Sequence, residues 1–454
     1  MKAKIVAVLI SLLFFGLIMS FFGCSKGRVE ELKKEKLFAI SIGESEEEIG
    51  VVKEPNGQFI GPSNVLFRNG FFYVVDTVNS KILKITTPGD VILVLARGYE
   101  QNEQEDDVLR TKQRKYYPFN TIGQIAIDNE NNIYIEEKTI EKLPEKDEID
   151  LFITDSSYEE ESDEIFKSYI LKFDRLGNYL FRIGEDGKGS GPFYYVYKME
   201  VDAHGDLIII TADENWNSWV YHKFDRDGNM VFKSELHVDD VFTVEDMEDT
   251  AFFIMDVLPV CSSSYLIYWA SVYNTSYDTK EIRKEEDLWG EEIEIDDLDS
   301  LKEQMEETEK KTNGRDLLFY KLLYYNLETN EIDKSYKWEN RLVDQVASTE
   351  ELFGIDGQTN SFFWKYINNT KAVISIYRPN GSLITRRGFV FEDDGLWTNV
   401  QIAIDGSVCA LKIDDKKLHF YRWRSDKLIS SKGEKVTIRE FIKDKIQEFK
   451  NANR

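Results

Sequence analysis

The chain of 454 residues has little cysteine, histidine or proline: it contains three cysteines, four histidines and eight prolines. Apart from Cys24, only Cys261 and Cys409 remain, so the sequence excludes a disulfide-rich scaffold. Both lie in apolar runs, and we expect two separate buried thiols. The sequence has no CxxC pair and no Cys/His cluster, which argues against a structural zinc site.

Positive charge is also scarce. The chain has 57 Lys and Arg against 83 Asp and Glu, for a net charge of -26. Such a surface repels phosphate backbones and anionic lipid headgroups. We therefore expect no nucleic-acid partner, and we expect any membrane attachment to come from an anchor rather than from a basic face.

The long apolar run that the sequence does contain lies at its N-terminus. Lysines at positions 2 and 4 precede an almost unbroken apolar segment, 5–23, which Cys24 follows directly. A short basic region, an apolar region and a small residue at the cleavage point are typical of a secretory signal. The Phe-Phe-Gly-Cys ending resembles the lipobox of bacterial lipoproteins. The resemblance implies that residues 1–23 form a lipoprotein signal peptide and that Cys24 carries acyl chains such as palmitate.

Two other interpretations of this terminus stay open at this point. The run is close to the roughly 20 residues needed to span a bilayer, so an uncleaved transmembrane anchor is one alternative. A plain secretory signal, with Cys24 unmodified, is the other. The lipoprotein interpretation predicts an envelope protein tethered to a bacterial membrane, on the periplasmic or cell-surface side, with residues 24–36 as a charged tether.

From residue 37 onward the sequence consists of short apolar runs separated by Gly, Asn and Asp turns, which predicts β-strands. Segment 64–95, segment 124–138 with its continuation 168–184, and segment 198–234 share one order. Each has two strands around a polar turn, a third strand, a tight Gly turn and a fourth strand. Asp-Gly and Asn-Gly tolerate the positive φ of hairpin turns. One such small sheet cannot bury both faces alone, so several sheets are expected to stack radially.

These repeats resemble NHL-type repeats and the related six-bladed β-propellers of bacterial lipoproteins. Segment 172–210 follows the family's order of strand, Gly turn, strand, Gly-rich loop and Gly-Pro-aromatic. Residues 76–82, Asp-Thr-Val-Asn-Ser-Lys-Ile, match the Asp-Thr-x-Asn-x-x-Ile signature. The resemblance covers 60–234 and implies an all-β fold, a six-bladed β-propeller of four-stranded antiparallel blades.

The second half of the sequence predicts three more blades. The fourth has strands near 252–273 and 317–338, the fifth spans 357–388 and the sixth spans 399–428. The strand at 37–43 is expected to pair with the last blade and close the ring. Closure removes exposed sheet edges, which otherwise promote aggregation.

The propeller is thus predicted to span 37–435, interrupted by two acidic insertions. These insertions, 139–166 and 275–314, have few apolar residues and are expected to be solvated loops, with a lid or docking arm as the functional alternative. Residues 436–454 have apolar side chains at helical spacing, which predicts a C-terminal helix packed on the outside.

Aromatic side chains cluster near the start of the third blade. Trp216 and Trp219 flank a short loop, and Tyr194, Tyr195 and Tyr197 lie close together. We expect them to pack in the core. The alternative is an aromatic platform for a sugar or peptide.

The sequence assigns no catalytic residue, no metal ligand and no cofactor, and it leaves the ligand-binding residues unknown. The four histidines do not cluster, and no nucleophile accompanies them. Aspartates recur at equivalent turns, which predicts Asx-type turns rather than a metal site. The recurring aspartates are Asp128, Asp174, Asp202, Asp225 and Asp405.

We therefore expect a membrane-anchored envelope lipoprotein whose propeller is a binding or scaffold module for a protein or carbohydrate partner. The alternative is a propeller hydrolase or lyase with a central metal such as calcium. Acidic side chains converging on the axis would favour the enzyme, whereas an apolar or aromatic wall would favour the binding module. A purely structural envelope protein would show neither feature.

Overall fold

The computed structural model describes most of the predicted propeller. The described residues are 30–54, 59–98, 112–142, 164–184, 192–193, 195–212, 218–237, 250–260, 264–274, 317–339, 342–343, 346–347, 350–368, 370–391 and 396–429. Cys24, Cys261, the predicted helix 436–454, all of the 275–314 insertion and the central part of the other insertion lie outside these residues.

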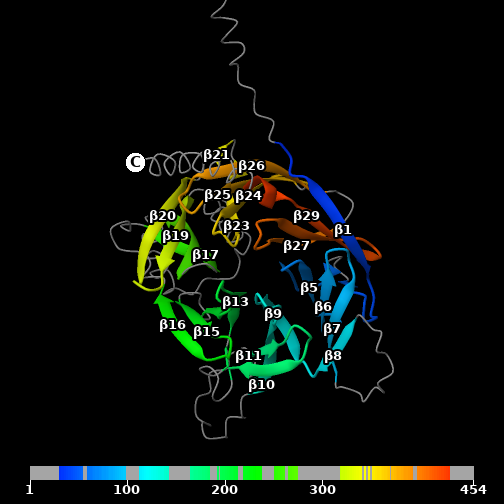
Figure 1. The fold of residues 1–454 in the computed structure, drawn as a ribbon. Coiled ribbons are helices and arrows are strands. Elements are labelled where there is room, and N and C mark those ends of the chain that lie inside the picture. The colour runs from blue at the N-terminus through cyan, green and yellow to red at the C-terminus, as the bar shows by residue number, and fades with distance from the viewer. Residues whose placement is uncertain are drawn as a thin grey trace, which may run out of the picture.

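Six sheets, each with four antiparallel strands, are arranged radially around one axis, as the sequence predicted (Figure 1). Chain order runs once around the ring, and in each blade the strand that follows the preceding blade lies nearest the axis. Each sheet is one blade. The all-β six-bladed propeller of four-stranded blades is confirmed.

Blades 1 to 3 come from the first half of the chain. Blade 1 contains β4 (Asn64–Arg68), β5 (Phe71–Asp76), β6 (Lys81–Thr86), β7 (Val91–Arg97) and β8 (Gln113–Tyr117). Blade 2 contains β9 (Thr121–Ile127), β10 (Ile133–Lys142), β11 (Glu164–Phe173) and β12 (Tyr179–Ile183). Blade 3 contains β13 (Val196–Val201), β14 (Leu207–Ala212), β15 (Ser218–Phe224) and β16 (Met230–His237).

Blades 4 to 6 complete the ring. Blade 4 contains β17 (Thr250–Pro259), β18 (Tyr265–Asn274), β19 (Leu317–Asn326) and β20 (Glu331–Glu339). Blade 5 contains β23 (Glu351–Ile355), β24 (Ser361–Asn368), β25 (Lys371–Tyr377) and β26 (Leu383–Val390). Blade 6 contains β27 (Leu396–Ile402), β28 (Val408–Ile413), β29 (Lys417–Trp423) and β1 (Lys34–Ser41). Two small hairpins pair β2 (Val52–Lys53) with β3 (Phe59–Ile60), and β21 (Leu342–Val343) with β22 (Val346–Ala347).

Ring closure joins the two ends of the propeller. The N-terminal β1 pairs antiparallel with β29 as the outermost strand of blade 6, which confirms the predicted closure. β1 begins at Lys34, so the end of the expected 24–36 tether belongs to the sheet. Leu32 before it is buried and its amide donates to the Gly388 carbonyl in blade 5.

Side chains pack between blades, with one hydrophobic cluster at each junction. β5 shows how the sequence achieves this. Phe72 and Val74 lie in the cluster between blades 6 and 1, whereas Tyr73 and Val75 lie in the cluster between blades 1 and 2. Successive residues of a strand point to opposite faces, so a sheet covered on both faces needs apolar residues at consecutive positions.

The Gly turns between third and fourth strands also hold the blades together. Gly228, in the turn of blade 3, has φ +83, and an added Cβ would lie 2.6 Å from the Phe181 ring of blade 2. Lys172 of blade 2 donates to the Arg226 carbonyl in the same turn at 2.6 Å. The glycine is therefore required both by the positive φ and by the close approach of the neighbouring blade.

The recurring aspartates form the predicted Asx turns. Asp225 Oδ1 accepts hydrogen bonds from the amides of Asp227 and Asn229 at 2.9 and 2.8 Å, and its Oδ2 accepts from the Asn229 side chain at 2.9 Å. Asp128, Asp174 and Asp202 accept from two backbone amides in the same way, and Asp405 accepts from the amide and hydroxyl of Ser407.

Three features extend or modify the predicted elements. β8 is a fifth strand of blade 1, parallel to β7, which the sequence did not predict. Residues 139–142 and 164–166, assigned to an acidic insertion, lie in β10 and β11. The described residues contain one short helix, at 425–429. Over the ranges given above, no helix is long and apolar enough to cross a membrane.

Candidate functional site

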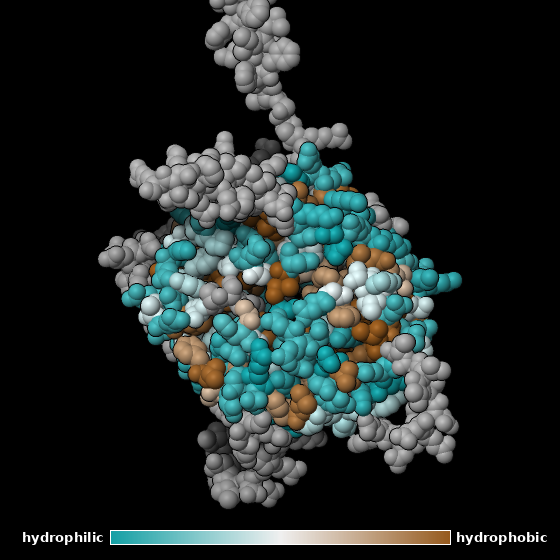
Figure 2. All heavy atoms as spheres, viewed as in Figure 1, coloured by the Kyte–Doolittle hydropathy of each residue, from teal (hydrophilic) through white to brown (hydrophobic). Residues whose placement is uncertain are grey.

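A pocket of about 210 Å³ lies near the axis, at the ends of the innermost strands of five blades. We call it the axial pocket. Its wall combines polar groups with apolar side chains, which include Leu66, Phe67, Leu258, Phe353, Val400 and Ile402. Figure 2 shows hydrophilic side chains over most of the face viewed along the axis, with hydrophobic ones near the middle of the ring.

Four charged side chains line the axial pocket: Arg68, Lys198, Glu200 and Asp356. Burial raises the pKa of the Glu200 carboxyl, and the nearby charges of Lys198 and Arg68 only partly oppose that rise. The Arg68 side chain is buried, and its Nη2 donates to Asn129 Oδ1 at 3.3 Å. Glu200 is thus a carboxyl whose charged form is disfavoured by burial, in a wall that also contains two positive groups.

Asp356 is engaged by its own turn. Its Oδ1 accepts from the amides of Gln358 and Asn360, both at 2.9 Å, and its Oδ2 accepts from the Asn360 side chain at 2.8 Å. Burial raises the pKa of Asp356, and these hydrogen bonds oppose the rise. Asp356 therefore shapes the pocket wall rather than offering a free carboxylate.

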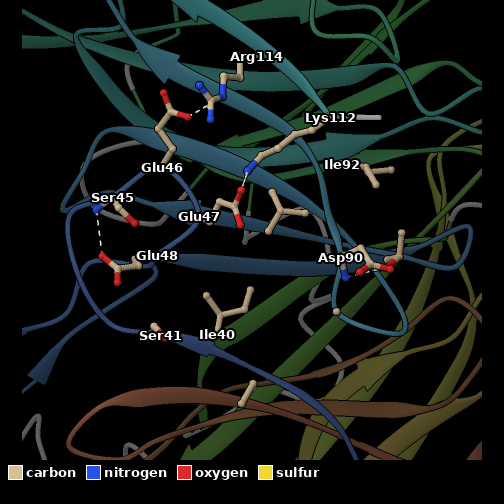
Figure 3. A pocket seen from close by; sticks show the side chains of 14 residues that line it. Ile40, Ser41, Ser45, Glu46, Glu47, Glu48, Asp90, Ile92, Lys112 and Arg114 are labelled. Atoms are coloured by element: carbon tan, nitrogen blue, oxygen red, sulfur yellow. Dashed lines mark hydrogen bonds and ion pairs between the residues drawn. The ribbon is translucent and has the colours of Figure 1, made fainter. Parts of the chain in front are cut away.

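A second, wider groove of about 1090 Å³ lies where the ring closes, between β1, residues 45–48 and blade 1 (Figure 3). Glu46 and Glu47 face Arg114 and Lys112 there. Arg114 Nε lies 2.6 Å from Glu46 Oε2, and Lys112 forms an ion pair with Glu47. These pairs connect β8 to the chain that follows β1, so we assign this rim groove a structural role in closure.

The Asp-Thr-Val-Asn-Ser-Lys-Ile segment contributes to the same closure. Asp76 is fully buried, and its Oδ2 accepts from the Gly50 amide at 2.9 Å and from Asn79 Nδ2 at 2.8 Å. Lys81 Nζ lies 3.7 Å from Asp76 and donates to the Ser45 carbonyl at 2.6 Å. These residues fix the connection from blade 6 to blade 1.

The three histidines whose side chains the structure describes, His204, His222 and His419, do not form a common site. His222 is buried in blade 3, and burial lowers its pKa from 6.5 to about 4. His419, in blade 6, lies 2.5 Å from Asp414 through Nε2, and its Nδ1 has no hydrogen-bond partner among the described residues. His204 contributes backbone atoms to a turn, with its carbonyl accepting from Arg226 at 2.7 Å.

The aromatic cluster of blade 3 packs largely in the core. Trp219 is buried, and Tyr197 meets its ring edge-on with centroids 4.7 Å apart. Tyr195 is exposed. Trp216 and Tyr194 lie outside the described residues. Packing is thus confirmed for Trp219 and Tyr197.

Cys409 is a free, buried thiol, as the sequence predicted. Burial raises its pKa to about 12. A thiol of this kind is almost entirely protonated at neutral pH and is a poor nucleophile.

Comparison with known proteins gives neighbours in structure only. No family model matches the chain, and no curated protein matches it. A putative exported protein from Bacteroides fragilis is 10% identical, with a TM-score of 0.38 over 87% of this chain and 99% of that one. A protein of unknown function from Dyadobacter fermentans is 10% identical, with a TM-score of 0.38 over 86% and 99%. A streptogramin B lyase is 9% identical, with a TM-score of 0.35 over 87% and 98%. At these values none of them bears on the activity of this chain.

Sequence reasoning did not find Glu200 or the other charged residues of the axial pocket. Glu200 stands in an ordinary alternating strand, 198–202, and nothing local marks it. Its place at the axis depends on strands from five blades that are distant in sequence. The one available signal was a charged residue in the first strand of a repeat, the strand that lies nearest the axis.

Proposed function

We propose that the protein is a cell-envelope lipoprotein, anchored in a bacterial membrane through lipid on Cys24, whose propeller is a binding module. In this proposal the axial pocket holds the ligand or the inserted part of a partner. The rigid ring positions the pocket, and the anchor keeps it at the membrane.

The observation that carries the binding role is the chemistry of the axial pocket wall. Apolar side chains from four blades line it, blade 3 adds Lys198 and Glu200, and of its two carboxyls Asp356 is engaged by its own turn. Within the described ranges, no three His, Cys, Asp or Glu side chains are grouped so that they could hold a metal ion. An apolar pocket with a few placed polar groups is typical of a small-ligand site.

The anchor is supported by the sequence. An apolar run ends directly at Cys24, and polar sequence follows at once with Ser25 and Lys26. The net charge of -26 disfavours direct adhesion to anionic lipid, so a covalent lipid is the attachment that fits this surface.

Small molecules that copurify with the protein test the binding role. Leu66→Trp fills the axial pocket, whereas Leu383→Trp places the same side chain on an exposed position of β26. We expect mass spectrometry to detect an envelope-derived molecule with the wild-type protein and with Leu383→Trp, but not with Leu66→Trp. Identical profiles for all three would contradict binding in the axial pocket.

Thermal unfolding with and without calcium separates this proposal from the metal-dependent alternative. We expect millimolar calcium to leave the melting temperature unchanged. A calcium-dependent rise that disappears in Glu200→Gln would instead favour the hydrolase or lyase.

A further inference from the structure

Glu200 differs from the other acidic side chains at the axial pocket in its hydrogen bonding. Within the described part of the chain, no hydrogen bond or ion pair engages its carboxyl. The other two acidic side chains, in or next to the pocket, already accept hydrogen bonds. Asp356 is held by its turn, and Asp256, beside the pocket, accepts from the Tyr197 hydroxyl at 2.6 Å and lies 3.8 Å from Lys198 Nζ.

The charged side chains that line the pocket balance, and Asp256, 3.8 Å from Lys198 Nζ, adds one more negative charge next to it. Arg68 and Lys198 are the positive groups, and Glu200, Asp256 and Asp356 are the negative ones. Arg68 directs Nη2 to Asn129 Oδ1 and to the Val201 carbonyl, at 3.3 and 3.4 Å, rather than to Glu200. A ligand with one positive charge would complete the balance and supply the donor that Glu200 lacks.

Two aromatic rings stand in the same wall. Phe67 and Phe353 both line the pocket, and Phe353 is held in place by stacking on Trp364, with ring centroids 4.6 Å apart. The face of an aromatic ring attracts a cation, and the attraction increases when the cation is desolvated. A carboxylate together with aromatic faces is a suitable environment for an organic ammonium group.

The volume limits the size of the occupant. A space of 210 Å³ corresponds to about seven water molecules, at ~30 Å³ each. A molecule of about ten non-hydrogen atoms or fewer therefore fits. Long peptides and oligosaccharides would have to place only one end in the pocket.

We propose that the axial pocket binds a small organic ammonium ion. Its apolar body contacts Leu66, Val400 and Ile402, and its ammonium group donates a hydrogen bond to Glu200 next to the two phenylalanine rings. This inference rests on the proposed function, because it names the ligand class for the same pocket.

Calorimetric titration of the full-length protein in detergent tests the ligand class with three probes of one shape. Cyclohexylammonium, cyclohexanol and cyclohexanecarboxylate carry a positive, a neutral and a negative group on the same ring. We expect cyclohexylammonium to bind at least about tenfold more tightly than either of the others, which is the size of a hydrogen bond to a charged group.

The variants assign the effect to Glu200. Glu200→Gln is expected to weaken cyclohexylammonium about tenfold or more and to leave cyclohexanol unchanged. Glu331→Gln, on the exposed β20, is the matched control and should change neither. Leu66→Trp should abolish binding of both, and melting curves of each variant show that it is folded.

Equal affinity for the three probes, an unchanged affinity in Glu200→Gln, or no binding of any probe would each overturn the ammonium assignment. The binding role is decided separately. If an envelope-derived molecule still copurifies with the wild type and is lost in Leu66→Trp, the pocket binds a ligand of another class. If neither result is obtained, both proposals fail.

Discussion

At the scale of single residues, the buried side chains of this propeller follow from the alternation of side chains along each strand. Polar side chains that are nevertheless buried, such as His222, have effects on stability that can be measured. His222 packs against the rings of Phe193 and Phe224, with centroids 5.4 and 6.3 Å away. Its Nδ1 has no hydrogen-bond partner among the described residues. Such a site favours the neutral imidazole, because an imidazolium there would be desolvated and its Nδ1 would lack an acceptor, although Nε2 lies 3.4 Å from Thr211 Oγ1.

We expect His222 to make the stability of the protein depend on pH. Its folded pKa of about 4 lies below the ordinary value of 6.5. Between these values the unfolded chain binds more protons, so this contribution is complete above pH 6.5 and is lost as the pH falls towards 4. The loss amounts to about 3 kcal/mol at the lower end.

Urea unfolding of the wild type and of His222→Phe, at neutral pH and near pH 4, measures this contribution. Phenylalanine suits the same aromatic surroundings and does not titrate. The wild type should lose about 3 kcal/mol more than the variant over this range. Equal losses would show that His222 is not the group responsible.

The turns and strands could be predicted from the sequence where the interactions that form them are local. The Asx turns and Gly turns were predicted from the sequence because an aspartate or a glycine acts on amides within four residues of itself. β8 was not predicted, since it pairs parallel with β7 and no hairpin turn joins the two strands. The ion pairs of Arg114 in β8 with Glu46, and of Lys112 just before it with Glu47, connect segments more than sixty residues apart, which no local pattern indicates.

The turn of blade 3 gives a prediction at this scale. Asp225→Ala removes the acceptor of two backbone amides and of the Asn229 side chain. We expect a loss of about 1.5 kcal/mol or more in the free energy of unfolding, since three hydrogen bonds are removed and each contributes roughly 0.5–1.5 kcal/mol.

The control for that turn is Asp415→Ala, at an exposed position in the turn between β28 and β29. It should change stability by less than about 0.5 kcal/mol. If both variants were equally stable, the Asx hydrogen bonds would not contribute to blade stability.

For the whole molecule, the repeat pattern predicted the ring and its closure, because four strands per repeat and one unmatched strand at the start leave a single arrangement without open edges. The residues of the axial pocket could not be predicted from the repeat pattern. Its wall joins side chains from β4, β13, β17, β23 and β27, and their meeting depends on the complete ring.

Closure should control the stability of the entire ring. Phe38 on β1 stacks on Phe420 with centroids 4.3 Å apart and is 9% exposed. Phe38→Ala is expected to cost about 3–5 kcal/mol and to speed unfolding, because it opens a cavity at the joint between the two chain ends. Stopped-flow unfolding measures both rates, and Leu383→Ala, at an exposed site on blade 5, should have little effect on the unfolding rate. A local effect confined to blade 6, detected by hydrogen exchange, would contradict the role of closure.

The most direct test of the proposed envelope lipoprotein is the intact mass and detergent phase partitioning of the protein from a bacterial host, beside Cys24→Ala. We predict a chain without residues 1–23, with an added lipid mass and partitioning into detergent, and we predict that the variant loses all three. An uncleaved and unmodified chain in both proteins would contradict the lipid anchor and, with it, the proposed location in the envelope.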